Sequence, residues 1–140
     1  MKIEVRCYSR GGGTAKIANA IADEAGCLVN MMDDKLDGAV DLMFLGSGVY
    51  AGKMGRPVYE FIEKLSAEYT GKIILFATAT SIESALKTCQ TVAALLREKG
   101  FNVDEESFQC PGKFLLANRS RPDQGDIGHA ASFAKKMMQK

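Results

Sequence analysis

The sequence predicts an α/β fold of the three-layer, doubly wound type, with a five-stranded parallel sheet between two layers of helices. Two observations predict it. Short apolar runs alternate along the chain with longer segments whose apolar residues recur every three or four positions. In addition, three of the apolar runs end in loops rich in glycine, serine or threonine, at residues 9–14, 46–55 and 78–81.

The expected strands are short and mostly apolar. The runs at 41–46 and 72–77 show no polar alternation, which is typical of strands buried on both faces of a parallel sheet. The segment 33–40 is expected to be a loop or a short helix. Strands are expected at residues 2–8, 27–32, 41–46, 72–77 and 101–109.

The expected helices each combine an apolar stripe with a residue that suits one helix end. Gly26 and Gly100 follow the first and third helices, where glycine commonly ends a helix. Pro57 suits the first turn of the second helix, and Ser81 is the candidate N-cap of the third. The segment 110–124 is expected to be irregular. Helices are expected at Thr14–Ala25, around Val58, Phe61, Ile62 and Leu65, from Ser81 to about Lys99, and at Asp126–Met138.

Length and composition fit a single domain covering residues 1–140. Hydrophobic residues make up 46% and charged residues 25%, as in a globular protein with a sizeable core. The net charge of +1 gives no argument for nucleic acid or an anionic membrane as a partner. No apolar run approaches the roughly 20 residues that span a bilayer, and no signal-peptide pattern precedes the first strand. We therefore expect a cytoplasmic protein, as a monomer or a weak homodimer.

The cysteines and the histidine argue against several kinds of chemistry. Cys7, Cys27, Cys89 and Cys110 are widely spaced, so we expect buried thiols in a reducing compartment rather than disulfides. His129 is the only histidine, which excludes a multi-histidine metal site. No Ser/His/Asp or Cys/His arrangement is supported, so we predict neither catalytic residues nor a metal.

The loop after the first strand is the strongest functional signal, and it consists of Ser9, Arg10, Gly11, Gly12, Gly13 and Thr14. Three successive glycines let backbone N–H groups approach a ligand closely. The helix that follows directs the positive end of its dipole at the same point, and the hydroxyls and the arginine add donors. The pattern predicts a phosphate-binding loop; a glycine-rich turn that only reverses the chain is the alternative.

Two common nucleotide motifs do not match. A Walker A loop needs Gly-x-x-x-x-Gly-Lys-Ser/Thr, but around Gly52-Lys53 the first position is Ser47 and the last is Met54. A dinucleotide fingerprint that starts at Gly11 needs glycine or alanine at position 16, which is Lys16. A mononucleotide-type phosphate is therefore the better fit.

On these loops the chain resembles the flavodoxin family. Ser9, Gly12 and Thr14 match the family pattern Ser/Thr-x-Ser/Thr-Gly-x-Thr, and Gly11 stands where a hydroxyl residue is usual. The second loop resembles the family pattern Gly-Ser-Pro-x-Tyr-x-Gly, with Gly48 in place of the proline. This loop comprises Gly46, Ser47, Gly48, Val49, Tyr50, Ala51 and Gly52.

The resemblance implies strand order 2-1-3-4-5 and an FMN-binding protein that carries electrons between redox protein partners. It places the FMN phosphate on residues 9–14 and the isoalloxazine ring along residues 47–52, with Tyr50 as the stacking aromatic. It also implies that the third loop approaches the pyrimidine side of the ring. The third loop consists of Thr78, Ala79, Thr80 and Ser81.

Departures from the family pattern keep two other functions open. The third loop has neither an aromatic residue nor a glycine, which leaves room for a small acceptor. That would suit a flavin-dependent reductase or oxidase similar to the flavodoxin-like protoporphyrinogen oxidases. Gly11 and the third loop also suit a flavodoxin-like binding module that has lost FMN. The near-neutral charge, with Lys53 and Arg56 beside the second loop, favours a less reducing flavin than in an acidic flavodoxin.

Overall fold

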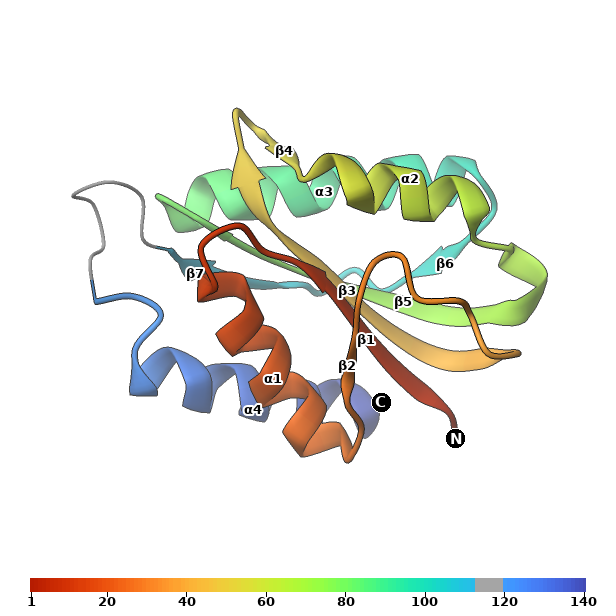
Figure 1. Ribbon diagram of the computed structural model, residues 1–140, viewed down its shortest axis with the longest axis horizontal. Coiled ribbons are helices and arrows are strands. Elements are labelled where there is room, and N and C mark those ends of the chain that lie inside the picture. The colour runs from red at the N-terminus through yellow and green to blue at the C-terminus, as the bar shows by residue number, and fades with distance from the viewer. Residues whose placement is uncertain (113–119) are drawn as a thin grey trace.

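The computed structural model describes residues 1–112 and 120–140 and confirms the predicted fold class, a mainly parallel sheet between two helical layers (Figure 1). The strands are β1 (Ile3–Tyr8), β2 (Val29–Asn30), β3 (Val40–Tyr50), β4 (Lys53–Met54), β5 (Thr70–Ala79), β6 (Asn102–Val103) and β7 (Phe108–Pro111). The helices are α1 (Gly13–Ala25), α2 (Arg56–Lys64), α3 (Ile82–Glu98), α4 (Gln124–Met138) and the short 3₁₀ helix η1 (Ala67–Tyr69).

The sheet has the strand order β2-β1-β3-β5-β6, and all of these pairings are parallel. β7 pairs with the end of β5 and so lies on the same side of β5 as β6, at the edge of the sheet. β4 pairs only with β3 and is antiparallel to it. With β4 set aside, this is the order 2-1-3-4-5 that the resemblance implies. The chain order reverses between β1 and β3, and sheets of this type bind ligands at that point.

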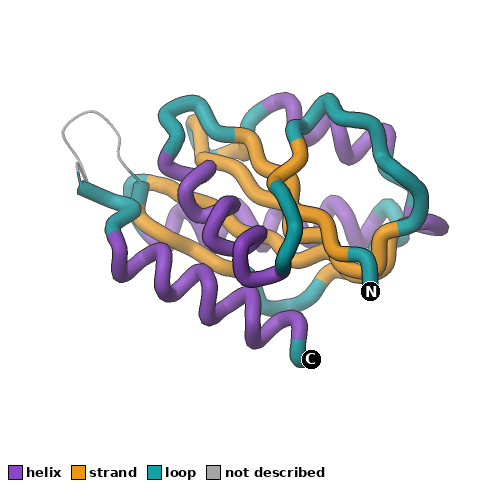
Figure 2. The backbone as a smooth tube through the Cα atoms, turned by 60° about the horizontal axis from the view of Figure 1, so that its bottom comes forward, coloured by secondary structure: helices purple, strands orange, loops and turns teal. Residues whose placement is uncertain are grey.

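Two helices cover each face of the sheet. α1 and α4 lie side by side on one face, and α2 and α3 cover the other (Figures 1 and 2). In β3, Leu42 and Phe44 pack with α1 and α4, whereas Met43 and Leu45 pack with α2 and α3. All four side chains are buried, which explains the missing polar alternation. Along residues 1–112 and 120–140, no helix has the length and apolar character to cross a membrane.

Several expected boundaries are wrong. The strand expected at 101–109 is two short strands, β6 and β7. Between them the Asp104 carboxylate accepts bonds from the Glu106 N–H and from two lysine ammonium groups, so the chain leaves the sheet to make these polar contacts. The strand expected at 27–32 keeps only β2. The segment 33–40, expected to be a loop or a short helix, is a loop up to Ala39, and Val40 begins β3. Of the segment expected to be irregular, residues 113–119 lie outside the described residues.

The 31–35 segment is held by Arg6, in the middle of β1. Arg6 is fully buried, and its Nε donates to the Glu4 carboxylate at 2.5 Å. The guanidinium lies 4.7 Å from the centroid of the Phe61 ring. Its Nη atoms donate to the main-chain carbonyls of Met31, Met32, Asp34 and Lys35. Because these carbonyls bond to a side chain and not to β1, β2 is short.

Replacing Arg6 with methionine keeps most of the volume and removes the cation. Arg6→Met is expected to lower the unfolding free energy by about 3–5 kcal/mol, because Glu4 becomes a buried charge without its counterion. Urea denaturation followed by circular dichroism measures the loss. Arg56→Met is the control, since that side chain is 89% exposed, and should change stability by less than about 0.5 kcal/mol. Equal effects of the two substitutions would contradict the assignment.

Candidate functional site

The three loops that the sequence marks as a site meet at the carboxyl edge of the sheet. Tyr8 pairs with Ser47 across β1 and β3, and Gly48 pairs with Thr78 across β3 and β5. The segments that follow these residues therefore start side by side, as expected for the ends of adjacent parallel strands. The structure confirms that the three loops converge.

The first loop turns sharply into α1. Gly12 has a φ of 83°, a left-handed conformation that favours glycine, and its N–H donates to the Ser9 hydroxyl at 3.0 Å. Within the described ranges, the amides of Gly11, Gly13 and Thr14 donate no hydrogen bond. Free N–H groups at a helix N-terminus form a suitable site for an anionic group such as phosphate.

A pair of hydroxyl groups links the first loop to β5. The Thr14 and Thr78 hydroxyl oxygens are 2.6 Å apart, and both side chains are buried. Since only one of the two protons lies between the oxygens, the other remains available to a ligand. The Ser9 hydroxyl likewise accepts a bond from Gly12 and keeps its own proton. The loop thus retains hydroxyl donors beside its free amides.

The second loop is a β-hairpin, so the expected end of the strand at residue 46 is wrong. β3 continues to Tyr50, and Ala51 and Gly52 form a two-residue turn into β4. Both turn residues have positive φ, 53° and 78°, as tight hairpins with a primed turn require. Ser47 is fully buried and accepts a bond from the Gly55 N–H at 2.9 Å, so its side chain closes the base of the hairpin.

Tyr50 leans from the second loop onto the first. Its hydroxyl oxygen accepts a bond from the Arg10 N–H at 3.0 Å, and the Arg10 guanidinium lies 4.2 Å from the ring centroid. The edge of the ring meets Tyr8, with the centroids 6.0 Å apart and the ring planes at 81°. One face of the Tyr50 ring is therefore covered by Arg10. Stacking of Tyr50 on a flavin stays a prediction.

Gly48 makes room for the phenol of Tyr50. A Cβ atom at this position would lie 2.5 Å from the Tyr50 hydroxyl oxygen and 3.4 Å from the Thr14 hydroxyl oxygen. Two hydroxyl groups from different loops thus converge over one glycine, next to the N-terminus of α1. We call this arrangement of Gly48, Tyr50 and Thr14 the cradle. Val49, the next residue, is half-buried against the α2–α3 core.

Of the third loop, expected at residues 78–81, only the second half lies outside regular secondary structure. Thr78 and Ala79 end β5 and are buried, whereas Thr80 and Ser81 are exposed. Ser81 is the N-cap of α3, as predicted, because its hydroxyl accepts a bond from the Ser84 N–H at 3.1 Å.

A hollow of about 420 Å³ lies between the hairpin turn and the first turns of α3. The second loop contributes Gly52 and the third contributes Ser81, and most of the remaining lining side chains carry hydroxyl groups. Its residues are Gly52, Ser81, Glu83, Ser84, Lys87, Thr88 and Thr91. The hollow therefore lies beside the place where the resemblance puts the isoalloxazine ring.

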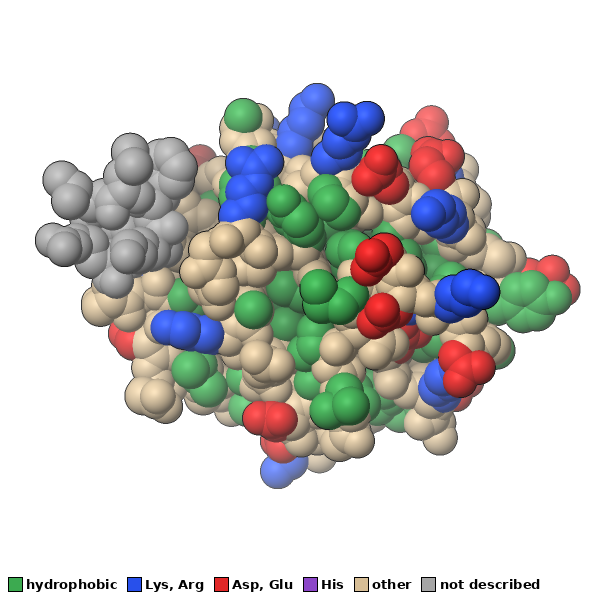
Figure 3. All heavy atoms as spheres, in the orientation of Figure 1, with side chains coloured by type: hydrophobic (Ala, Val, Ile, Leu, Met, Phe, Trp, Pro, Cys, Tyr) green, Lys and Arg blue, Asp and Glu red, His purple; other side chains and the backbone are tan. Residues whose placement is uncertain are grey.

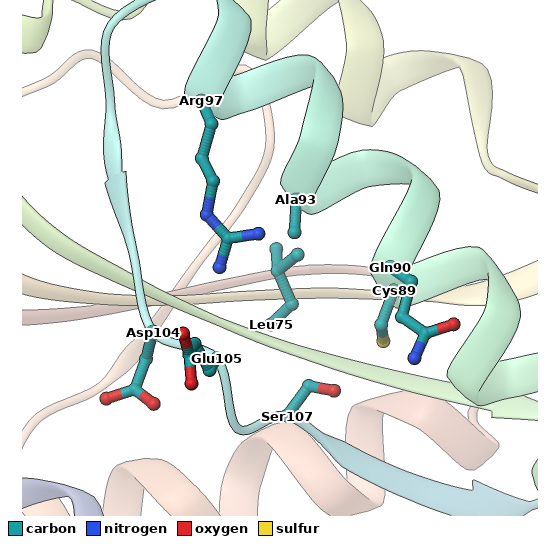
Figure 4. A pocket seen from close by; sticks show the side chains of 8 residues that line it. All are labelled: Leu75, Cys89, Gln90, Ala93, Arg97, Asp104, Glu105 and Ser107. Carbon is teal, nitrogen blue, oxygen red and sulfur yellow. The ribbon is translucent and has the colours of Figure 1, made fainter.

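A smaller hollow of about 200 Å³ lies between α3 and the segment that joins β6 to β7 (Figure 4). Arg97, on its wall, donates a hydrogen bond to the Val103 carbonyl at 3.0 Å and so already has a partner. None of the residues that line it belongs to the three loops. We therefore assign the candidate site to the loops and not to this hollow.

The segment before α4 also reaches the site, although no sequence motif marks it as a binding segment. Pro122 lies against the first loop, since a Cβ on Gly13 would be 3.2 Å from its Cδ. Arg121 donates two bonds to the Asp126 carboxylate, at 2.5 and 2.7 Å. Asp126 and Asp123 form a capping box at the start of α4. No local sequence pattern predicts the contact of Pro122 with Gly13, because the two residues are far apart in the chain.

The cysteines are not activated as nucleophiles, and the described acidic residues do not cluster as metal ligands. Burial raises the pKa of the Cys7 and Cys110 thiols to about 12 and that of Cys89 to about 11. These thiols are protonated at neutral pH, which makes them poor nucleophiles. Among residues 1–112 and 120–140, no group of three or more His, Cys, Asp or Glu side chains is placed to hold a metal ion.

Comparisons with known sequences do not show a family for this chain. A comparison with models of protein families finds no match. The chain is 29% identical over 136 residues to the uncharacterized protein MJ0298 of Methanocaldococcus jannaschii, and the match covers 89% of each chain.

Solved structures are similar over nearly the full length. Oxidised flavodoxin 1 from Bacillus cereus superimposes with a TM-score of 0.76 at 16% identity, covering 99% of this chain and 98% of that one. A flavodoxin from the domain Archaea also has a TM-score of 0.76, at 20% identity, with 99% and 97% covered. The chain has the flavodoxin-like fold.

Asp126 provides a test of the segment beside the first loop. Its bonds to Arg121 lower the pKa of the Asp126 carboxyl from 3.8 to about 2. Because the unfolded chain binds this proton more readily, the interaction stabilises the fold above about pH 4 and is lost as the pH falls toward about 2. The urea midpoint should decrease over this range, and the decrease should be smaller in Asp126→Asn. A decrease of equal size in both proteins would contradict the assignment.

Proposed function

We propose that this chain binds FMN, with the phosphate on the first loop, and carries electrons between redox protein partners. The observation that supports this most directly is the cradle, together with the free amides of Gly11, Gly13 and Thr14. A phosphate monoester carries up to two negative charges and three acceptor oxygens. The donors at this site and the dipole of α1 match that ligand in charge and in number.

The expected free energy of binding also favours FMN. A hydrogen bond to a charged group contributes about 1.5–3 kcal/mol, so three or four such bonds supply a large part of the roughly 12 kcal/mol of nanomolar binding. The donors lie at a helix N-terminus on a well-packed sheet, which keeps them in place before the ligand arrives. These residues therefore fit the phosphate of FMN.

The rest of the site suits a flat, polar ring system. FMN, when bound, supplies the one- and two-electron chemistry, and the protein positions the ring and sets its surroundings. Gly52 and Ser81 border the hydroxyl-lined hollow where one end of the ring would lie. The turn at Ala51 and Gly52 is exposed and offers backbone groups to the ring edge.

Charge at this edge supports a carrier with a moderately reducing flavin. Lys53 is exposed and the Arg56 side chain is 89% exposed, and Figure 3 shows basic side chains over the β4 hairpin and the beginning of α2. Positive charge near a flavin stabilises its anionic reduced form and so raises its potential. The exposed hairpin would also let a partner protein approach the ring edge.

A second candidate function is a flavin-dependent reductase or oxidase that acts on a small acceptor. The 420 Å³ hollow favours it, since none of the described residues that line that space is aromatic. Repeated reduction of a small acceptor such as a quinone by the FMN-loaded protein, with a reduced nicotinamide as the electron donor and without a second protein, would decide for the enzyme over the carrier.

Binding of FMN is tested by titration. FMN added to the purified chain should lose its fluorescence, and the protein should be yellow after gel filtration. Gly48→Ala should weaken FMN binding at least about tenfold, because its Cβ would lie 2.5 Å from the Tyr50 hydroxyl oxygen. Gly128→Ala is the control, since outside its own helix no described residue lies within 4 Å of its added Cβ. Unchanged FMN fluorescence with the wild-type chain would refute the proposal.

The basic hairpin is tested by potentiometry. Lys53→Glu/Arg56→Glu should lower the midpoint potential of bound FMN by roughly 10–50 mV, as expected from exposed-charge interactions of about 0.2–1 kcal/mol. Lys64→Glu, at the other end of α2, should change the potential less. A potential that rises in the double variant would contradict the electrostatic argument.

A further inference from the structure

The first loop has fewer side-chain donors than its length allows. Gly11, Gly12 and Gly13 carry none, so the hydroxyl groups of this loop are those of Ser9 and of Thr14, which is paired with Thr78. A hydroxyl group nevertheless lies at this loop, and it comes from the second loop. It is the phenol of Tyr50, whose oxygen is 3.0 Å from the Arg10 amide nitrogen.

The direction of this hydrogen bond leaves the phenol proton free. An N–H group can only donate, so Tyr50 is the acceptor in its bond with Arg10. Within the described residues, the Tyr50 hydroxyl donates to no protein group. Burial also raises the pKa of Tyr50, so the hydroxyl keeps this proton at neutral pH.

The hydroxyl is also in the right place. It lies 2.5 Å from the position that a Cβ on Gly48 would take, and the Thr14 hydroxyl oxygen lies 3.4 Å from the same point. Both oxygens therefore lie near Gly48, beside the free amides at the start of α1. A phosphate oxygen bound at the start of α1 would meet donors from both loops.

Three contacts hold the ring in this position. The Arg10 guanidinium covers one face at 4.2 Å, Tyr8 meets the ring edge, and the Arg10 amide holds the phenol oxygen. Tyr8 in turn lies over Gly55, where an added Cβ would come within 2.1 Å of its ring. A donor held this firmly loses little conformational entropy when it binds a ligand.

We propose that Tyr50 is a phosphate-binding residue: its hydroxyl reaches over Gly48 and supplies the donor that Gly11 lacks. The inference rests on the proposed FMN function and adds a specificity to it. A flavin that ends in a phosphate monoester gains this hydrogen bond, and a flavin without the phosphate does not.

The affinities of Tyr50→Phe for FMN and riboflavin test this inference. The substitution keeps the aromatic ring and removes only the hydroxyl. The dissociation constant for FMN should rise about tenfold or more, whereas that for riboflavin, which lacks the phosphate, should change less than about twofold. Tyr59→Phe is the matched control, since the Tyr59 hydroxyl accepts a bond from Met54 N–H at 3.0 Å in the same hairpin. Equal losses for FMN and riboflavin would overturn the inference.

Rescue gives an independent readout. The backbone at Gly11 has no positive φ, and within residues 1–112 and 120–140 nothing lies within 4 Å of an added Cβ, so a serine side chain fits there. Gly11→Ser in the Tyr50→Phe background should recover most of the lost FMN affinity. Failure to recover it in a double variant that melts at the wild-type temperature would count against the inference.

Inorganic phosphate separates this inference from the proposed function. Phosphate should raise the melting temperature of the wild-type chain more than that of Tyr50→Phe, in the absence of any flavin. If the wild-type chain binds neither flavin but shows this difference, the FMN proposal fails and the role of Tyr50 stands. If the two proteins respond equally to phosphate, the role of Tyr50 is refuted whether or not FMN binds.

Discussion

The buried guanidinium of Arg6 is the interaction on which the arrangement around β1 depends. A charge in the interior is tolerated only when every donor has a partner, and the chain meets this demand with Glu4 and four carbonyls of the 31–35 segment. That segment is the connection between β2 and β3, so β1 is held as an inner strand with a neighbour on each side. β1 ends at Tyr8, two residues after Arg6, and the first loop begins at Ser9. This loop therefore starts from a strand that has little freedom to move.

At the carboxyl end of β1, glycine positions allow the loops to approach one another. Gly55 makes room for Tyr8 and Gly48 makes room for Tyr50, and the two rings meet edge to face. The Thr14–Thr78 pair closes the same edge from the inside. The site is therefore one connected set of contacts from three loops. A substitution in one loop is expected to shift the side chains of the others.

The fold class and the meeting of the loops were predictable, because periodicity and glycine placement are local and parallel strands end at one edge. The strand order came from the resemblance to the flavodoxin family. The sequence also marked Gly26 and Ser81 correctly as helix-end residues. Three contacts were not predictable: those of Arg6 with the 31–35 segment, of Tyr50 with Arg10, and of Pro122 with Gly13. Each depends on a partner that is distant in the chain, and no local pattern encodes it. The extension of β3 was missed because its glycines and Ser47 are typical of loops, and only pairing with β5 and β4 makes the segment a strand.

The glycine at position 48 has an evolutionary consequence. A β-carbon there and the phenol of Tyr50 would occupy the same space, so a larger residue at 48 and this tyrosine conformation exclude each other. The two positions are thus expected to covary among chains with this loop. A lineage that gained a side chain at 48 would have to turn its tyrosine outward or replace it, and a hydroxyl at position 11 would then be favoured by selection.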